Sequence, residues 1–264
     1  MSREPKVYLV GAGPGDPELL TVMARRLLGE ADVVVYDRLV SEDVLALIPP
    51  GTARIDVGKQ PKNHPYPQRE INALLVSLAK SGKRQVVRLK GGDPLIFGRG
   101  SEELLALAAH GIACEVVPGV TAASGCAARL GIPLTHRGLA SGVRYVTGHC
   151  RDDADLDFDW QGLADPETTL VIYMGKANID RIAARVMAHG LDPATPVVAI
   201  CNGTTAAERH LFANLGNVAK MTESAGFEGP LLFIVGRAVN VAQALRGQPG
   251  DTDDCESVRQ ARVG

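Results

Sequence analysis

Two glycine-rich turns carry the residues of this chain that are best suited to hold a small molecule. KVYLVGAGPGD spans residues 6–16, and VVRLKGGDPLIFGRG spans residues 86–100. Each turn follows a run rich in β-branched residues and precedes a helical pattern, as at a nucleoside or phosphate site on a parallel sheet. Pro14 has no N–H to offer an anion, and Asp16 would repel one. The pattern therefore favours a nucleoside-like ligand over a phosphate-rich one.

Two further strand-to-helix junctions add candidate ligand contacts. VPGVTAASGCAAR places Thr121 and Ala122 at a helix start, where free N–H groups can meet a ligand. TLVIYMG ends an apolar strand with Tyr173 and Met174 directly before a glycine. On its own segment, the first junction is better explained as an ordinary capped helix, and methionine more often fills gaps in a core.

The segment VVVYDRLVS ends another strand with Asp37 and Arg38. An acidic residue ~20–25 positions after a glycine turn suits a ribose hydroxyl in a nucleotide-binding fold. Asp37 could equally act as a general base or begin the next helix. Its position alone leaves these three roles open.

Cationic residues gather in the segment VGKQPKNHPYPQREIN at 57–72, where Lys59, Lys62, His64 and Arg69 alternate with prolines. A solvated loop and a lid that meets a polyanion are equally consistent with this composition.

Other junctions add Arg99, His136, Arg137 and Arg144 to these cationic groups. Because arginine pairs carboxylates through two parallel hydrogen bonds, the combination predicts a small polycarboxylate substrate.

Composition is that of an ordinary globular protein. The 264 residues are 45% hydrophobic and 22% charged, with a net charge of −2. This balance predicts no attraction to nucleic acid or to an anionic membrane. No apolar run reaches the ~18 residues of a spanning helix, and MSREPK lacks the apolar run of a signal peptide. The five cysteines show no CxxC spacing, so we expect a cytoplasmic protein with reduced thiols and no metal site.

The elements that must position these residues alternate between strand and helix in the first half. Strands are expected at 6–10, 32–36, 85–89 and 114–117, and helices near 17–29, 41–47, 69–80, 101–109 and 121–130. This alternation predicts a parallel α/β domain.

The second half is expected to form another α/β domain with mixed strand directions. Strands are expected at 143–147, 168–173, 197–201 and 231–235, with helices near 178–189 and 238–245 and a possible hairpin at 204–217. The acidic segment 151–167 is interpreted as a surface connection, and 131–142 as a linker. The expected divisions are an N-terminal domain at 1–134, a C-terminal domain at 135–246 and a disordered tail at 247–264.

Together these segments resemble the tetrapyrrole methylase family. GAGPGD, GGDP with FGRGSEE, VPGVTAA and YMG follow in the family's order between about Lys6 and Leu245. YDRLVS and the GK…H…Q.EIN stretch resemble members that act on uroporphyrinogen III rather than on later intermediates. The resemblance implies two α/β domains of the tetrapyrrole methylase type, with S-adenosylmethionine in the cleft between them, and a homodimer.

The implied reaction is C-methylation of uroporphyrinogen III at C2 and C7, giving precorrin-2 via precorrin-1 and releasing S-adenosylhomocysteine. The implied donor contacts are Pro14, Gly91, Gly92, Asp93, Ile96, Thr121, Ala122, Met174 and Gly203. The implied catalytic residues are Asp37 as proton acceptor, Lys59 as proton donor, and Arg99. The implied substrate contacts are Arg38, Lys62, His64, Glu102, Arg137 and Tyr173.

Three alternatives stay open. A nicotinamide-dependent dehydrogenase could use GAGPGD and Asp37, although Pro14 and Asp16 suit a pyrophosphate poorly. A sister methylase would act on a later corrin intermediate, which the 57–72 segment argues against. A non-catalytic tetrapyrrole-binding protein would bind the macrocycle without the methyl donor.

Overall fold

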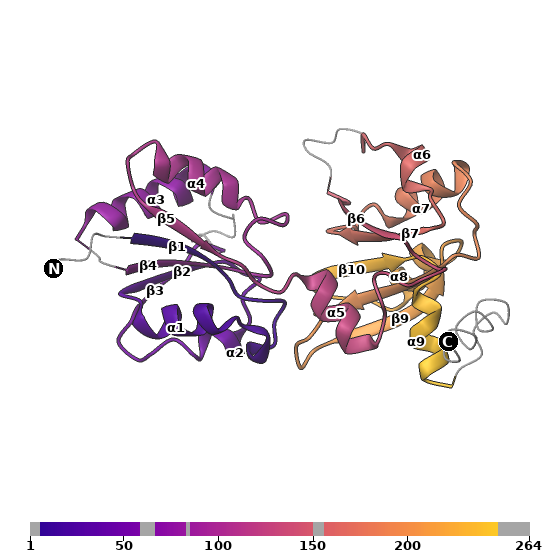
Figure 1. Cartoon of the computed structure of the whole chain (residues 1–264), viewed down its shortest axis with the longest axis horizontal. Coiled ribbons are helices and arrows are strands. Elements are labelled where there is room, and N and C mark those ends of the chain that lie inside the picture. The colour runs from indigo at the N-terminus through magenta and orange to yellow at the C-terminus, as the bar shows by residue number, and fades with distance from the viewer. Residues whose placement is uncertain (1–5, 59–66, 83–84, 150–155, 248–264) are drawn as a thin grey trace. The chain divides into compact units, whose positions relative to one another are not determined.

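The computed structural model describes residues 6–58, 67–82, 85–149 and 156–247 (Figure 1). The chain divides into two compact units, Met1–Ala122 and Ala123–Gly264. Each unit contains one five-stranded sheet.

The first unit is built on a parallel sheet in the order β3-β2-β4-β1-β5. Its strands are β1 (Lys6–Gly11), β2 (Val33–Tyr36), β3 (Ala53–Asp56), β4 (Gln85–Lys90) and β5 (Cys114–Val117). The register pairs Gly11 with Lys90 and Tyr36 with Leu89, so neighbouring strands end at one edge of the sheet. The predicted parallel α/β arrangement is confirmed, and the segments that follow these strands meet at that carboxyl edge.

Helices cover both faces of this sheet (Figure 1). They are the 3-10 helix η1 (Pro17–Leu19), α1 (Val22–Glu30), α2 (Glu42–Leu45), α3 (Gln68–Lys80) and α4 (Gly100–Ala108). On one face, α1 and α2 pack on Val10, Val34 and Leu89. On the other, α3 and α4 pack on Val7 and Val86. Successive residues of β4 thus face opposite cores, as the period of a strand requires.

The second unit contains a mixed sheet in the order β6-β7-β10-β8-β9. Its strands are β6 (Gly142–Thr147), β7 (Thr168–Tyr173), β8 (Pro196–Cys201), β9 (Arg209–Asn214) and β10 (Leu231–Val235). Strands β6 and β7 pair in parallel, whereas β10 pairs antiparallel with β7 and β8, and β9 antiparallel with β8. The expected mixed strand direction is confirmed. The segment 204–217 does not form a hairpin by itself: it contributes the single strand β9, which pairs antiparallel with β8.

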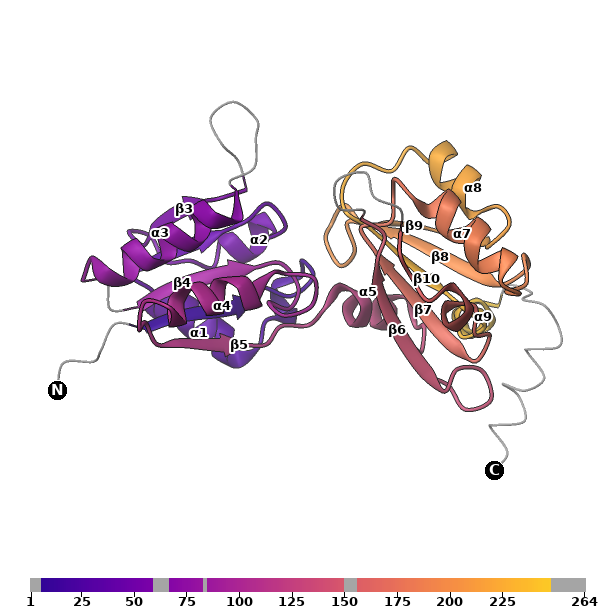
Figure 2. The same cartoon turned by 90° about the horizontal axis from the view of Figure 1, so that it is seen from above.

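One face of this second sheet, drawn as a cartoon in Figure 2, carries a large apolar core. Helices α6 (Trp160–Leu163), α7 (Ile179–Ala188) and α8 (Val218–Ser224) pack there, and α9 (Val239–Leu245) completes the unit. Ile172 and Phe233 have no exposed surface and lie in the centre of this core.

Helix α5 (Ala122–Leu130) packs with the second unit. The Ala123 amide donates to the Tyr173 hydroxyl at 3.1 Å, and Arg129 pairs with Glu208 at 3.2 Å. The compact units therefore divide at Ala122, ahead of the boundary at residue 134 expected from the sequence. The assignment of 1–134 and 135–246 as separate functional domains stays a prediction.

Candidate active site

Three turns of the first unit meet at the carboxyl edge of its sheet, after β1, β4 and β5. The Gly13 amide donates to the Gly92 carbonyl at 3.2 Å, and the Gly92 amide donates to the Gly13 carbonyl at 2.7 Å. The Asp93 carboxylate accepts from the Gly119 amide at 3.1 Å. The turns that the sequence assigns to one ligand are thus bonded to one another.

Glycine is required where these turns touch. A Cβ on Gly119 would lie 2.2 Å from the Gly92 carbonyl oxygen and 2.8 Å from the Gly11 Cα. A Cβ on Gly91 would lie 2.6 Å from the Leu39 Cβ. None of these distances leaves room for a side chain. Glycine is therefore needed at both positions so that the backbone segments can approach each other closely.

The amides of the first turn are bonded to neighbouring groups. Ala12 donates to the Lys90 carbonyl at 2.8 Å, and Gly13 donates to Gly92. Asp16 accepts from the Glu18 amide at 2.9 Å and caps η1. With the Ala12 and Gly13 amides occupied and Pro14 lacking one, the turn has fewer N–H groups to offer a pyrophosphate than a typical dinucleotide-binding turn. This geometry argues against the dehydrogenase alternative and fits a donor that carries no phosphate.

The implied donor contacts lie in turns of both units. Those in the first unit are Pro14, Gly91, Gly92, Asp93, Ile96, Thr121 and Ala122. Thr121 is buried, while Pro14 and Ile96 are half-buried. In the second unit, Met174 directly follows β7 and is 50% exposed, and Gly203 follows β8. Their contacts with a donor stay predictions.

Backbone strain among the described residues coincides with these turns. Five non-glycine residues have φ values between 50° and 66°: Phe97, Arg99, Met174, Asn202 and Thr204. All five lie in the segments GGDPLIFGRG, YMG and ICNGTT, which the sequence assigns to donor or substrate. Left-handed φ values in side-chain-bearing residues cost free energy and cluster at functional sites. This independent observation supports the assignment of these turns to a binding site.

Two packing relationships fix the turns of the second unit. A Cβ on Gly203 would lie 2.2 Å from the Cys126 Sγ, so the turn after β8 rests directly on α5. The Tyr173 hydroxyl accepts from the Ala123 amide, and its ring packs edge-on against Tyr145 with centroids 5.7 Å apart. Tyr173 therefore connects the end of β7 to the start of α5, and its expected contact with substrate stays a prediction.

Asp37 lies at the carboxyl edge of the first sheet, immediately after β2. Its Oδ1 accepts from the Leu39 amide at 3.1 Å, and its Oδ2 lies 3.2 Å from Nη2 of Arg88. The side chain is 26% exposed. A partly exposed carboxylate held at both oxygens keeps unused lone pairs that can accept a proton.

Arg99 occupies the N-cap of α4 with φ 56° and pairs with Glu102 at 2.7 and 2.8 Å. The hydrogen bonds that Arg99 donates to Glu102 raise the pKa of the Arg99 guanidinium. It therefore stays protonated, which suits an anion contact better than proton acceptance. The structure brings Arg99 and Glu102 together, but the roles of both residues stay predictions.

The remaining implied substrate residues are distributed more widely. Arg38 is exposed beside Asp37. Arg137 is exposed in a turn of the second unit that lines a shallow pocket together with Glu167 and Arg237. Lys59, Lys62 and His64 lie outside the described residues.

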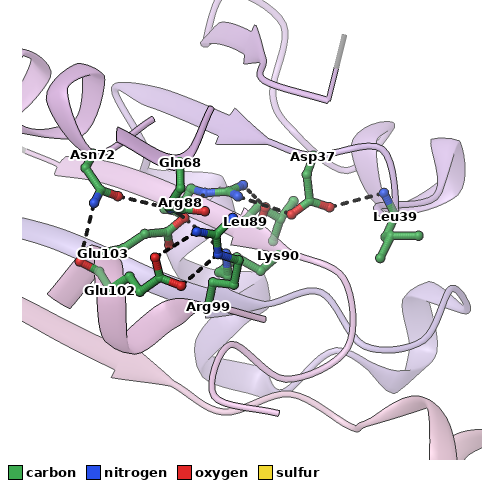
Figure 3. A network of polar contacts seen from close by, with 10 residues as sticks. All are labelled: Asp37, Leu39, Gln68, Asn72, Arg88, Leu89, Lys90, Arg99, Glu102 and Glu103. Carbon is green, nitrogen blue, oxygen red and sulfur yellow. Dashed lines mark hydrogen bonds and ion pairs between the residues drawn. The ribbon is translucent and has the colours of Figure 1, made fainter. Parts of the chain in front are cut away.

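Three buried charged residues, which the sequence reasoning did not select, lie to one side of Asp37: Arg88, Lys90 and Glu103 (Figure 3). Their exposed fractions are 2%, 4% and 0%. Burial, and next the positive charge of Arg88, lower the pKa of the Lys90 ammonium. In the sequence, the segment VVRLKGGD could have indicated this cluster. Its two basic residues interrupt an apolar strand two positions apart, so both side chains point to the same face of the sheet.

Within the described residues, no group of three or more His, Cys, Asp or Glu side chains is arranged to hold a metal ion. None of the helices in this part of the chain has the length and apolar character needed to cross a membrane.

Fold and site together define an α/β protein of two units, with strained, glycine-rich turns at the strand ends as its candidate ligand site. The family model for tetrapyrrole (corrin/porphyrin) methylases matches residues 6–219. The chain therefore belongs to the tetrapyrrole methylase family, which confirms the predicted family and fold class.

Individual relatives refine this similarity. Uroporphyrinogen-III C-methyltransferase of Paracoccus denitrificans is 54% identical over 238 residues, which cover 90% of this chain and 83% of the relative. Siroheme synthase of Hahella chejuensis is 52% identical over 91% of this chain, which spans about half (51%) of that protein. A crystal structure of uroporphyrin-III C-methyltransferase from Thermus thermophilus, complexed with S-adenosylhomocysteine, aligns with a TM-score of 0.76 and 46% identity, covering 89% of this chain and 99% of that one.

Proposed function

We propose that this chain transfers methyl groups from S-adenosylmethionine to C2 and C7 of uroporphyrinogen III, giving precorrin-2 via precorrin-1. The predicted enzyme class, substrate and methyl donor agree with the names of its close relatives and with the S-adenosylhomocysteine complex of the Thermus protein. The family assignment and 54% identity to a curated uroporphyrinogen-III C-methyltransferase carry this conclusion.

The turns around Gly92, Asp93 and Thr121 are proposed to hold the donor, together with Met174 and Gly203 of the second unit. Bound S-adenosylmethionine supplies a methyl group on a cationic sulfur, which an electron-rich pyrrole carbon can attack without a protein nucleophile. The main task of the protein is then to hold carbon, methyl and sulfur in line. Alignment of this kind can contribute ~7–11 kcal/mol to a barrier reduction.

Asp37 is proposed to accept the proton that leaves the macrocycle after methylation. Its position at the sheet edge, its partial exposure and its unused lone pairs support this role. Lys59 stays the proposed proton donor. Arg99 is proposed to contact a substrate carboxylate, because its guanidinium stays protonated beside Glu102.

The polycarboxylate substrate is proposed to meet cationic groups from several segments. Arg38, Lys62, His64 and Arg137 are the proposed contacts, with Glu102 and Tyr173 beside them. A homodimer and a cytoplasmic location stay part of this proposal, since the comparisons address neither.

An anaerobic assay with labelled S-adenosylmethionine and uroporphyrinogen III tests the proposal. Two methyl groups per macrocycle, measured by label and product mass, are the expected result. Donor binding without transfer would favour the sister-methylase alternative and a different tetrapyrrole. Macrocycle binding without donor binding would favour the non-catalytic alternative.

A further inference from the structure

The charged residues of β4 lie on one face of the first sheet. Val86, Arg88 and Lys90 share the face covered by α3 and α4, because side chains two apart point the same way. The face is apolar at Val86 and becomes ionic towards the carboxyl edge, where Asp37 follows the neighbouring strand β2. The change from apolar to charged thus occurs beneath the proposed catalytic carboxylate.

Glu103 of α4 holds these basic groups together. Its Oε1 accepts three hydrogen bonds, each at 3.1 Å, from Nε of Arg88, Nζ of Lys90 and Nε2 of Gln68. Its Oε2 has no hydrogen-bond partner among the described residues. Because Glu103 has no exposed surface, its orientation is fixed by these three donors.

Arg88 connects this buried carboxylate to Asp37 (Figure 3). Its Nε contacts Glu103, its Nη1 donates to the Leu89 carbonyl at 2.9 Å, and its Nη2 lies 3.2 Å from Asp37 Oδ2. The planar guanidinium makes all three contacts in one orientation. Asp37 is therefore held by Arg88 from below and by the Leu39 amide at its other oxygen.

A buried ionic cluster such as this one is weak evidence for a contribution to stability. Asp37, Arg88, Lys90 and Glu103 carry two positive and two negative formal charges, so the group is neutral as a whole. Removing charges from water is costly, and well-packed apolar residues of similar volume are often as stabilising as a buried ion pair or more so. A requirement for orientation at the sheet edge explains why charges occupy this position.

We propose that Arg88, fixed by Glu103, is a positioning residue that sets the orientation of the Asp37 carboxylate for proton transfer. This inference rests on the proposed function, because it takes Asp37 as the proton acceptor. Arg88 acts through Asp37 and has no assigned contact with donor or substrate.

A double-mutant cycle between Arg88→Met and Asp37→Asn tests this role. Arg88→Met leaves Glu103 paired with Lys90 and Gln68, so no buried charge loses all its partners. We expect single-turnover formation of the methylated and deprotonated product to slow by up to ~10²-fold, as for a small misplacement of a catalytic group, with the donor Kd unchanged. In the Asp37→Asn background, the same substitution should change the rate less than about twofold, because coupled residues are not additive.

Two further variants separate positioning from folding. Arg88→Lys keeps the positive charge but loses the planar guanidinium, and should give an intermediate rate. If Arg88→Met does not fold, Arg88→Lys takes its place in the double-mutant cycle. Arg54→Met removes another arginine of this sheet, which donates to the Ile48 carbonyl at 2.7 Å, and should leave the rate unchanged.

Equal rate losses in the two Asp37 backgrounds would overturn the inference and leave the proposed function intact. A wild-type protein that transfers no methyl group would instead remove the proposed function. In that case, crystal structures of the wild-type protein and of Arg88→Met test whether Arg88 orients Asp37, independently of activity. A displaced Asp37 carboxylate in the variant supports the positioning role of Arg88, and an unmoved one overturns it.

Discussion

The carboxylate of Asp93 joins two of the glycine turns, because its Oδ2 accepts from the Gly119 amide at 3.1 Å. Its Oδ1 accepts from the Leu95 amide at 2.8 Å within its own turn. Both oxygens are therefore used to hold backbone at the proposed donor site. This arrangement gives Asp93 a role in shaping the site that is separate from any contact with the donor.

Asp93→Asn should weaken donor binding. An asparagine side chain offers one carbonyl oxygen, so one of the two amides loses its acceptor. The loss of one such bond to a charged group corresponds to roughly a tenfold or greater rise in the donor Kd. Calorimetry with S-adenosylhomocysteine measures it. Asp192→Asn is the matched control. Asp192 lies in a similar turn, where its Oδ1 accepts from the Ala194 amide, and its substitution should leave the Kd unchanged.

Gly203→Ala should destabilise the second unit, because the new Cβ would lie 2.2 Å from the Cys126 Sγ. Overpacking of this kind typically costs about 1–3 kcal/mol. Cys126→Ala removes the clashing sulfur, so the double variant should recover most of the loss. Chemical denaturation of the four proteins gives the coupling between the sites. Additive losses would show that the turn relaxes away from α5 instead.

Several elements were predictable because local patterns and burial agree. The apolar runs of β1, β4 and β10 lie in buried strands, and all three were predicted within one or two residues. Strand β3 was missed because it lies at the sheet edge, where Ala53 and Arg54 are exposed and no apolar run forms. Helix α6 was missed because it has four residues within an acidic segment.

The site was less predictable than the fold. Motif order identified the turns, but Gly119 and Gly203 owe their identity to contacts with residues distant in the chain. No spacing rule in a single sequence shows such contacts. Arg88 and Glu103 were missed because isolated charges usually indicate solvated faces, whereas here tertiary packing buries them together.

Asp37→Asn should slow formation of the methylated and deprotonated product while donor binding is kept. The amide preserves the shape of the carboxylate but cannot accept a proton, and losing a general base typically costs ~10²–10⁴-fold in rate. Single-turnover formation of the methylated and deprotonated product measures this step. Asp32→Asn is the matched control, since Asp32 lies at the opposite end of β2, where its Oδ2 accepts from the Gln85 amide. An unchanged rate in Asp37→Asn would remove the proton-acceptor role.

Arg137→Ala should raise the KM for uroporphyrinogen III with little change in donor affinity. Arg137 is exposed, and an arginine that pairs a substrate carboxylate contributes roughly tenfold or more in binding. Steady-state kinetics with each substrate varied in turn separate the two effects. Lys220→Ala removes another exposed positive charge of the same unit and should leave both constants unchanged. A change in donor affinity alone would assign Arg137 to the donor site.

The stability of the protein should fall above pH 9 in part because of Cys126. Burial raises the pKa of this thiol from 9.0 to about 12 in the folded protein. Between these values the folded state keeps a proton that the unfolded state has lost, so the free energy of unfolding decreases as pH rises. One thiol contributes at most about 1.4 kcal/mol per pH unit. Denaturation of wild type and Cys126→Ala from neutral pH to above 9.0 measures this slope, which should be shallower in the variant. Parallel curves for the two proteins would show that Cys126 does not contribute to the alkaline loss.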